Sequence, residues 1–356
     1  MPAGGEAPFR AARGSGVQRL PVGAFAFVMA TGIVSDAFDG IGMPVESVAL
    51  LVIAAAGLVV LAAASVWRFV SYRADVLRDA RDPARMFGLF TLVAALNVVG
   101  VRAYSPGAPA VTIVLAAISV PFWLLFTYGL PASLFLRART GPSAAEADGS
   151  WFLWVVGTQS LATASATLGK EYSNHLLAAV AVAMWGIGVM LYLMLATIIT
   201  LKLLTTPPSP LNLNPSYWIY MGATAITVLA GSTILALPAE LPVIQATAHL
   251  VSGLTYLLWA FGAWWVPLLL IFGFWRHVVH RQPLRYEAGL WSIVFPLGMY
   301  SVASLHFGAV ARLPLLVRIG DVGTWVAGLV WLAVSAAMIH AWLAKPGPTA
   351  ATTDQL

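Results

Sequence analysis

Residues 291–303 read WSIVFPLGMYSVA, an apolar helical stretch with a proline in its middle. Pro296 cannot donate a hydrogen bond to the carbonyl of Ser292, and its ring crowds that turn, so we expect the helix to bend there. Gly298 removes side-chain bulk next to the bend. Phe295 therefore presents a bulky ring beside a kink, and such a ring either closes a pore or packs as an ordinary core residue.

The composition of the whole chain is that of a membrane protein. Of its 356 residues, 60% are apolar and only 9% are charged, whereas a soluble globular chain is about a quarter charged. The absence of cysteine excludes disulfide scaffolds, thiolate zinc sites, thiol nucleophiles and iron–sulfur clusters. Only six scattered histidines remain for metal chemistry, and we expect neither a metal site nor a cofactor.

Ten apolar segments are long enough to cross the hydrocarbon core of a bilayer, which needs about 20 residues. They are 20–41, 47–68, 86–102, 109–136, 151–168, 175–203, 216–237, 247–275, 288–310 and 319–343. The sequence therefore predicts an all-α polytopic membrane protein. We expect one membrane domain at 20–343, between an N-terminal tail at 1–19 and a C-terminal tail at 344–356.

The positions of Lys and Arg test this count independently of hydropathy. With ten spans, 15 of the 19 Lys and Arg residues fall on the side of the termini, and only Arg102, Lys170, Arg312 and Arg318 fall on the other. The positive-inside rule then predicts that both termini are cytoplasmic and that the protein lies in the inner (plasma) membrane. Because topology explains the net charge of +5, we expect no nucleic-acid partner.

The ten segments repeat in pairs. The odd-numbered segments begin near residues 20, 86, 151, 216 and 288. The odd segments carry 18 Ser, Thr, Asn and Gln in about 102 residues, whereas the even segments carry 13 in about 133 residues. Tryptophan shows the opposite bias, because ten of the 14 Trp lie on even segments. Trp favours the lipid interface. We therefore expect five helical hairpins, with the odd helices around a central pore and the even helices outside.

Polar side chains at helical spacing on the odd segments are the candidate pore-lining residues. They are Thr31, Ser35, Asn97, Ser160, Thr163, Thr224 and Thr227. The alternative is that small polar groups only let membrane helices pack closely and hydrogen-bond to one another. Packing alone, however, gives no reason for the polar bias to alternate from helix to helix.

The central parts of the odd segments contain no Asp, Glu, Lys or Arg. A relay of fixed charges or a tight cation site is therefore not supported, whereas hydroxyls and freed backbone N–H groups suit a passing anion. His306 is the one histidine near the predicted pore, and it either senses pH or is a packed, hydrogen-bonded residue. Asp36 and Asp39 either face a vestibule or lie at a solvated helix end.

Several motifs together resemble one known family. They are AFAFVMATGIVS at 24–35, GSWFLWVVGTQSLA at 149–162, PSYWIYMGATAITVLAGSTIL at 215–235, and WWVPLLLIFGFWRH at 264–277 leading to 291–303. From about Leu20 to Trp342 the chain resembles the tellurite-resistance/C4-dicarboxylate transporter family, which includes sulfite exporters and the slow-type anion channels of plant guard cells. The resemblance implies ten helices as five hairpins around a pore, a homotrimer with one pore per subunit, and a gate phenylalanine that corresponds to Phe295.

We therefore expect a lipid-embedded channel or transporter for small anions of the C4-dicarboxylate, tellurite, sulfite, halide or nitrate class, gated by Phe295. A proton-coupled carrier of dicarboxylates or oxyanions is the alternative. An intramembrane enzyme is a third class, but the chain has no H-E-x-x-H, no G-x-S-x-G and no paired mid-membrane carboxylates. We accordingly expect no catalytic residues.

Overall fold

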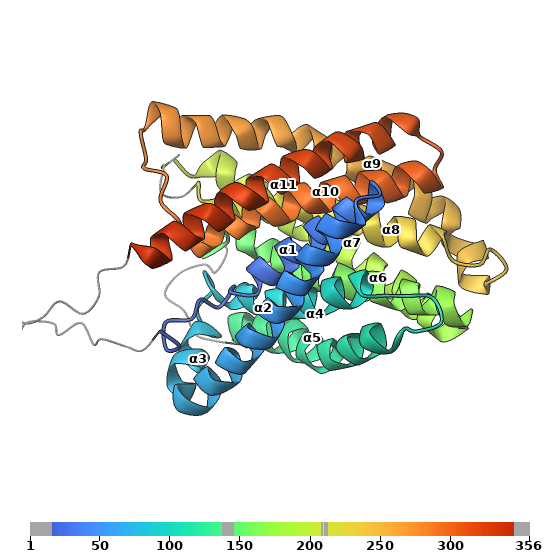
Figure 1. The fold of residues 1–356 in the computed structure, drawn as a ribbon, viewed down its shortest axis with the longest axis horizontal. Coiled ribbons are helices and arrows are strands. Elements are labelled where there is room, and N and C mark those ends of the chain that lie inside the picture. Colours follow the sequence, from blue (N-terminus) through green and yellow to red (C-terminus); the bar gives the residue numbers. More distant parts are fainter. Residues whose placement is uncertain (1–15, 137–145, 208, 210–212, 345–356) are drawn as a thin grey trace, which may run out of the picture.

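The computed structural model describes residues 16–136, 146–207, 209 and 213–344, and within these ranges it is helical with no strand (Figure 1). The α-helices are α1 (Ala26–Gly40), α2 (Pro44–Ser71), α3 (Arg73–Asp79), α4 (Phe90–Arg102), α5 (Ala110–Leu136), α6 (Leu153–Tyr172), α7 (His175–Thr205), α8 (Trp218–Leu235), α9 (Pro242–Phe274), α10 (Trp291–Val310) and α11 (Pro314–Leu343). The all-helical prediction is confirmed for these ranges. Most of both expected tails, and Arg10, Arg13, Arg137, Arg139 and Lys345, lie outside the described residues.

Seven of these helices, with their adjoining turns, are long and apolar enough to cross a membrane. They are α2, α5, α7, α8, α9, α10 and α11. The helices α1 and α4 have 15 and 13 residues and are shorter than a full span, and α6 carries several hydroxyl and amide side chains. The chain is a multi-pass membrane protein.

The helices form an inner ring with a partner outside each member. The helices α1, α4, α6, α8 and α10 contact one another in order, and α10 returns to contact α1. The partners α2, α5, α7, α9 and α11 each pack on the ring helix that precedes them in the chain. The ring helices are largely buried, whereas the outer helices expose most of their apolar residues. Shielding from lipid explains why ring helices can be short or polar.

Short 3₁₀ turns precede four of the ring helices, at Met86–Leu89, Gly149–Phe152, Pro215–Tyr217 and Ala288–Leu290. Two of these turns are capped in the same way, because the side chain of Asp148 accepts the N–H of Ser150 and that of Asn214 accepts the N–H of Ser216. Caps of this kind satisfy N–H groups that the first helical turn leaves free. They help to define where α6 and α8 begin.

Candidate functional site

A cavity of about 700 Å³ opens where the five ring helices begin, and we call it the vestibule. Each ring helix contributes its first turn to the wall, through Ala26, Thr91, Leu153, Ile219 and Ser292. The N-termini of five helices therefore converge on one space. Free N–H groups and the positive ends of helix dipoles favour negative charge at such a place.

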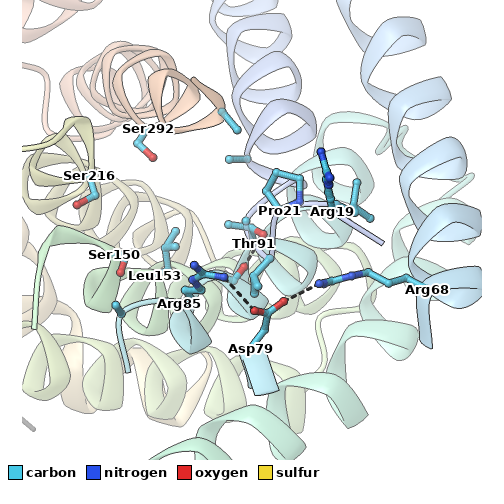
Figure 2. Close-up of a pocket in the computed structure, with 18 of the residues that line it drawn as sticks. Arg19, Pro21, Arg68, Asp79, Arg85, Thr91, Ser150, Leu153, Ser216 and Ser292 are labelled. Atoms are coloured by element: carbon cyan, nitrogen blue, oxygen red, sulfur yellow. Dashed lines mark hydrogen bonds and ion pairs between the residues drawn. The ribbon is translucent and has the colours of Figure 1, made fainter. Parts of the chain in front are cut away.

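The charged side chains of the vestibule are predominantly basic. They are Arg19, Arg68, Arg78, Arg85, Asp75 and Asp79. Asp79 lies between two of the arginines, with Arg68 Nη2 at 2.6 Å from Oδ2 and Arg85 Nη1 at 3.2 Å from Oδ1. Figure 2 shows this group on one side of the vestibule. With four arginines against two aspartates, the wall carries net positive charge.

Hydroxyl groups face the vestibule from the opposite side, where Figure 2 shows Ser150, Ser216 and Ser292. The hydroxyls of Ser150 and Ser216 donate to the carboxylate of Asp148, at 2.5 and 3.1 Å. Sequence reasoning did not single out these serines. The signal that could have found them is a capping Asp or Asn two residues ahead of a Ser, which occurs before both α6 and α8.

A second, much smaller cavity of about 20 Å³ lies further along the same ring. It has room for about one water molecule. All five ring helices line it, through Ile33, Asp36, Asn97, Val98, Val101, Ser160, Thr163, Ile226, Leu229 and Met299. Three predicted pore-lining residues are thus brought together here. Asn97 Nδ2 donates to Ser160 Oγ at 3.1 Å, and Thr163 donates to the carbonyl of Gln159 at 3.0 Å.

Phe295 lies on the face of α10 that connects the two cavities. Ser292 lines the vestibule and Met299 lines the small cavity, and Phe295 is three residues after the first and four before the second. Its side chain is 0% exposed. Ala94 of α4 and Ala223 of α8 occupy the corresponding positions between cavity-lining residues and are also buried. The large ring of Phe295 therefore lies at the same level as the small side chains of Ala94 and Ala223.

Comparison with known proteins identifies the group to which this arrangement belongs. Residues 19–339 match the family described as voltage-dependent anion channel. The chain belongs to the voltage-dependent anion channel family. The match confirms the resemblance drawn from the sequence motifs, and it places the protein among membrane channels and transporters, which are not enzymes.

Individual relatives of this family member carry general names. An uncharacterized membrane protein of Mycobacterium tuberculosis strain H37Rv is 48% identical over 150 residues, which are 42% of this chain and 76% of that protein. An uncharacterized transporter of Methanocaldococcus jannaschii is 28% identical over 122 residues, 34% of each chain. Both similarities agree with a membrane protein of the anion channel and transporter type.

Two other predicted pore-lining residues of this anion channel family member face the outer helices. The hydroxyl of Thr31 accepts a hydrogen bond from Trp331 Nε1 of α11 at 3.0 Å. The hydroxyl of Ser35 donates to the carbonyl of Ser47 on α2 at 2.7 Å, and Ser47 donates back to the carbonyl of Ser35 at 2.7 Å. These contacts join a ring helix to outer helices, and neither residue lines the two cavities described above.

The two predicted pore-lining threonines of α8 also contact outer helices. A Cβ built at Gly262 of α9 would lie 2.4 Å from Thr224 Oγ1, so Thr224 points at α9. The carbonyl of Thr227 accepts a hydrogen bond from Trp185 Nε1 of α7 at 3.0 Å, and its hydroxyl donates to the carbonyl of Ala223 at 2.7 Å. The vestibule and the small cavity are instead lined on α8 by apolar residues such as Ile226.

The remaining predicted residues lie on α10. This helix continues through Pro296, and Gly298 lets it approach α1, because a Cβ at 298 would lie 3.0 Å from Ile33 Cγ2. His306 is exposed near the far end of the helix, within electrostatic range of Asp36. Within the described part of the chain, no three His, Asp or Glu residues lie close enough to hold a metal ion.

Proposed function

We propose that the protein conducts small anions along the axis of the ring formed by α1, α4, α6, α8 and α10. The observation that carries this proposal is that the same five helices line both the vestibule and the small cavity. The two spaces follow one another along a single face of each helix. A pathway between them needs only the displacement of the side chains at the level of Phe295.

The proposed anion preference rests on the charge and hydrogen-bonding groups along this path. The vestibule combines an excess of arginines with helix N-termini, which raises the local concentration of anions. The small cavity is lined by neutral polar side chains such as Asn97 and Thr163, whose donor groups bond to oxygens of the ring helices in this structure. Neutral groups can replace part of an anion's water shell without trapping the ion. We propose inorganic oxyanions, halides and C4-dicarboxylates as the substrate class.

We further propose that Phe295 is the gate. Its ring separates a wide space from a narrow one and excludes water between them, so an ion has to shed hydration to pass. The family resemblance supports the same assignment. Pro296 and Gly298 follow directly and shape the backbone around the gate, because one removes a helical hydrogen bond and the other removes side-chain bulk.

The proposed setting is the inner membrane, crossed by ten helices that form five hairpins between short tails, with the vestibule open to the cytoplasm. Ten of the fourteen described Lys and Arg residues lie at the vestibule end, which supports this orientation. Reporter fusions before Met1 and after Leu356 test it, and both are expected to report cytoplasm. A periplasmic signal from either end would contradict the ten-helix arrangement.

A homotrimer with one pore per subunit is proposed from the family resemblance.

The transport activity is tested with the purified full chain in liposomes. Flux of chloride, nitrate, sulfite, malate and tellurite is measured with and without a pH gradient, with protein-free liposomes as the control. At least one of these anions is expected to move down its own gradient far faster than in the control. Background flux for all five at every pH would overturn the proposed function.

A proton-coupled carrier is the second candidate, and one observation favours it. Asp36 lines the small cavity, so a titratable group faces the proposed path. Coupling predicts that a pH gradient alone drives anion uptake against the anion's own gradient. A passive channel only equilibrates the anion, so the same liposomes separate the two mechanisms.

A further inference from the structure

A carboxylate lies on the narrow part of the proposed pathway. Asp36 of α1 lines the small cavity together with Asn97, Ser160 and Thr163. Its side chain is only partly exposed. Within the part of the chain that the structure describes, no hydrogen bond or ion pair reaches its oxygens. A carboxylate held in this way in the wall of an anion pathway requires an explanation, because every other lining group there is neutral.

The charged groups that face Asp36 come from three ring helices. They are His306 of α10, Arg102 of α4 and Asp39 of α1 itself. Arg102 is already engaged, since its Nη2 lies 2.8 Å from Asp39 Oδ1 and its guanidinium also donates to the hydroxyl of Ser47. The residues of α6 and α8 that line the small cavity carry no charge. Among the described residues, Asp36 forms no ion pair with either His306 or Arg102, although both lie within electrostatic range.

The ionisation state of this carboxyl decides whether an anion can occupy the cavity. In a cavity with room for about one water, an entering anion comes within about 5 Å of the carboxylate. At that separation and an effective dielectric constant of about 20, repulsion lowers anion occupancy on the order of 100-fold. A protonated carboxyl carries no charge and adds an O–H donor. Protonation thus changes the same group from a repulsive to an attractive neighbour.

We propose that Asp36 is a specificity-determining, proton-binding residue of the pathway, and that anions pass the small cavity only while its carboxyl is protonated. The inference rests on the proposed function, because it assumes that anions use this cavity. It assigns the pH dependence of transport to one carboxyl between Phe295 and the far end of the ring. Flux should therefore increase as the pH falls.

Asp36→Asn tests the proposal, because the amide has the shape of the protonated acid and cannot ionise. The full-length protein is reconstituted in liposomes, and flux of an anion transported by the wild type is measured from pH 8 to pH 5. Wild-type flux is expected to rise at least tenfold over this range. Asp36→Asn is expected to lose that dependence and to conduct at pH 8 as fast as the wild type does at pH 5.

Four further variants keep the test decisive. Asp36→Ala supplies a second neutral side chain if the amide disturbs folding, and Asp36→Glu keeps an acid and should keep the pH dependence. Asp321→Asn, on α11 and away from the cavity lining, should behave as the wild type. If the neutral Asp36 variants keep the wild-type pH profile, or if only His306→Gln abolishes it, the inference is wrong. Absence of wild-type flux at every pH would instead contradict the proposed function.

Discussion

Pro296 of α10 lies directly against Gly222 of α8, so that a Cβ built at residue 222 would be 2.8 Å from Pro296 Cγ. Both residues are next to the buried level of Phe295 and Ala223. The rigid proline ring therefore occupies space that only a glycine on the neighbouring helix leaves open. This contact holds two ring helices together at the level where the proposed gate lies.

Gly222→Ala is expected to destabilise the protein by about 1–3 kcal/mol, the usual cost of overpacking a well-packed core. The proline ring cannot rotate away, so the helix backbones have to separate. Gly186→Ala on α7 is the matched control, because a Cβ there meets no atom within 4 Å, and it should be neutral or stabilising by up to about 1 kcal/mol. Thermal unfolding of the two purified variants measures the difference. Equal melting temperatures would show that the contact relaxes freely.

Phe295→Ala is expected to raise anion conductance at least tenfold, since each ~1.4 kcal/mol removed from the barrier is a tenfold gain in rate. The conductance of Phe295→Leu should lie between those of the wild type and Phe295→Ala, because leucine keeps apolar bulk and loses the flat ring. Single-channel or liposome flux measurements give the rates, and melting temperatures are recorded beside them.

The control for this experiment is Phe307→Ala, on the same helix and equally buried. Removing a packed phenylalanine costs roughly 3–5 kcal/mol and leaves a cavity, so Phe307→Ala should lower the melting temperature without increasing flux. If Phe295→Ala behaves in the same way, Phe295 is a core residue and not the gate.

Thr163→Val and Thr31→Val are expected to affect different properties, although both replace a hydroxyl by a methyl of similar size. Thr163 lines the small cavity, so its loss should change the relative permeability of two anions. Thr31 accepts the indole N–H of Trp331, so its loss should cost about 1–3 kcal/mol of stability and leave selectivity unchanged. Thr227→Val should cost less stability than Thr31→Val, because Trp185 donates to the backbone carbonyl of residue 227, which valine keeps. Reversal potentials and unfolding curves separate the outcomes, and a selectivity change in Thr31→Val alone would contradict the assignment.

Glu171, at the loop end of α6, should contribute stability that depends on pH. The Tyr104 hydroxyl and the Gly107 N–H donate to its carboxylate and hold the pKa of Glu171 below its ordinary value of 4.5. A lowered folded-state pKa gives stability that is present above pH 4.5 and is lost as the pH falls through the folded value. Melting temperatures between pH 6 and pH 3 should therefore fall less in Glu171→Gln than in the wild type. Tyr104→Phe should reduce the same dependence, and parallel curves for all three would contradict the role of this contact.

The all-helical, multi-span character of the chain could be predicted from the sequence because apolar length is a local property. Each of the ten expected segments coincides with an observed helix, although several ring helices start later than their apolar run, as α1 does at Ala26 instead of residue 20. The residues between the start of each apolar run and the start of its helix form turns at the vestibule wall. Hydropathy does not distinguish an apolar turn from the first turn of a helix.

The candidate site could be predicted only in part. Asn97, Ser160 and Thr163 line a cavity, whereas Thr31, Ser35 and Thr224 contact outer helices. Helical spacing places polar groups on one face, but a ring helix has polar contacts on two faces, towards the axis and towards its partner. A hydroxyl satisfied by a carbonyl of its own helix, as in Thr163, is compatible with either face.

The sequence by itself determined the fold class, the family and the polar character of the inner helices, because burial in lipid requires long apolar runs and leaves polar residues only where protein shields them. Only the tertiary structure decided which polar groups meet. Four arginines, two aspartates and five helix starts far apart in the chain form one vestibule, and Asp36 stands on the wall of the small cavity instead of at a solvated helix end. The physical reason is that these neighbours depend on the rotation of each helix about its axis, which is set by close contacts between helices such as that of Pro296 with Gly222.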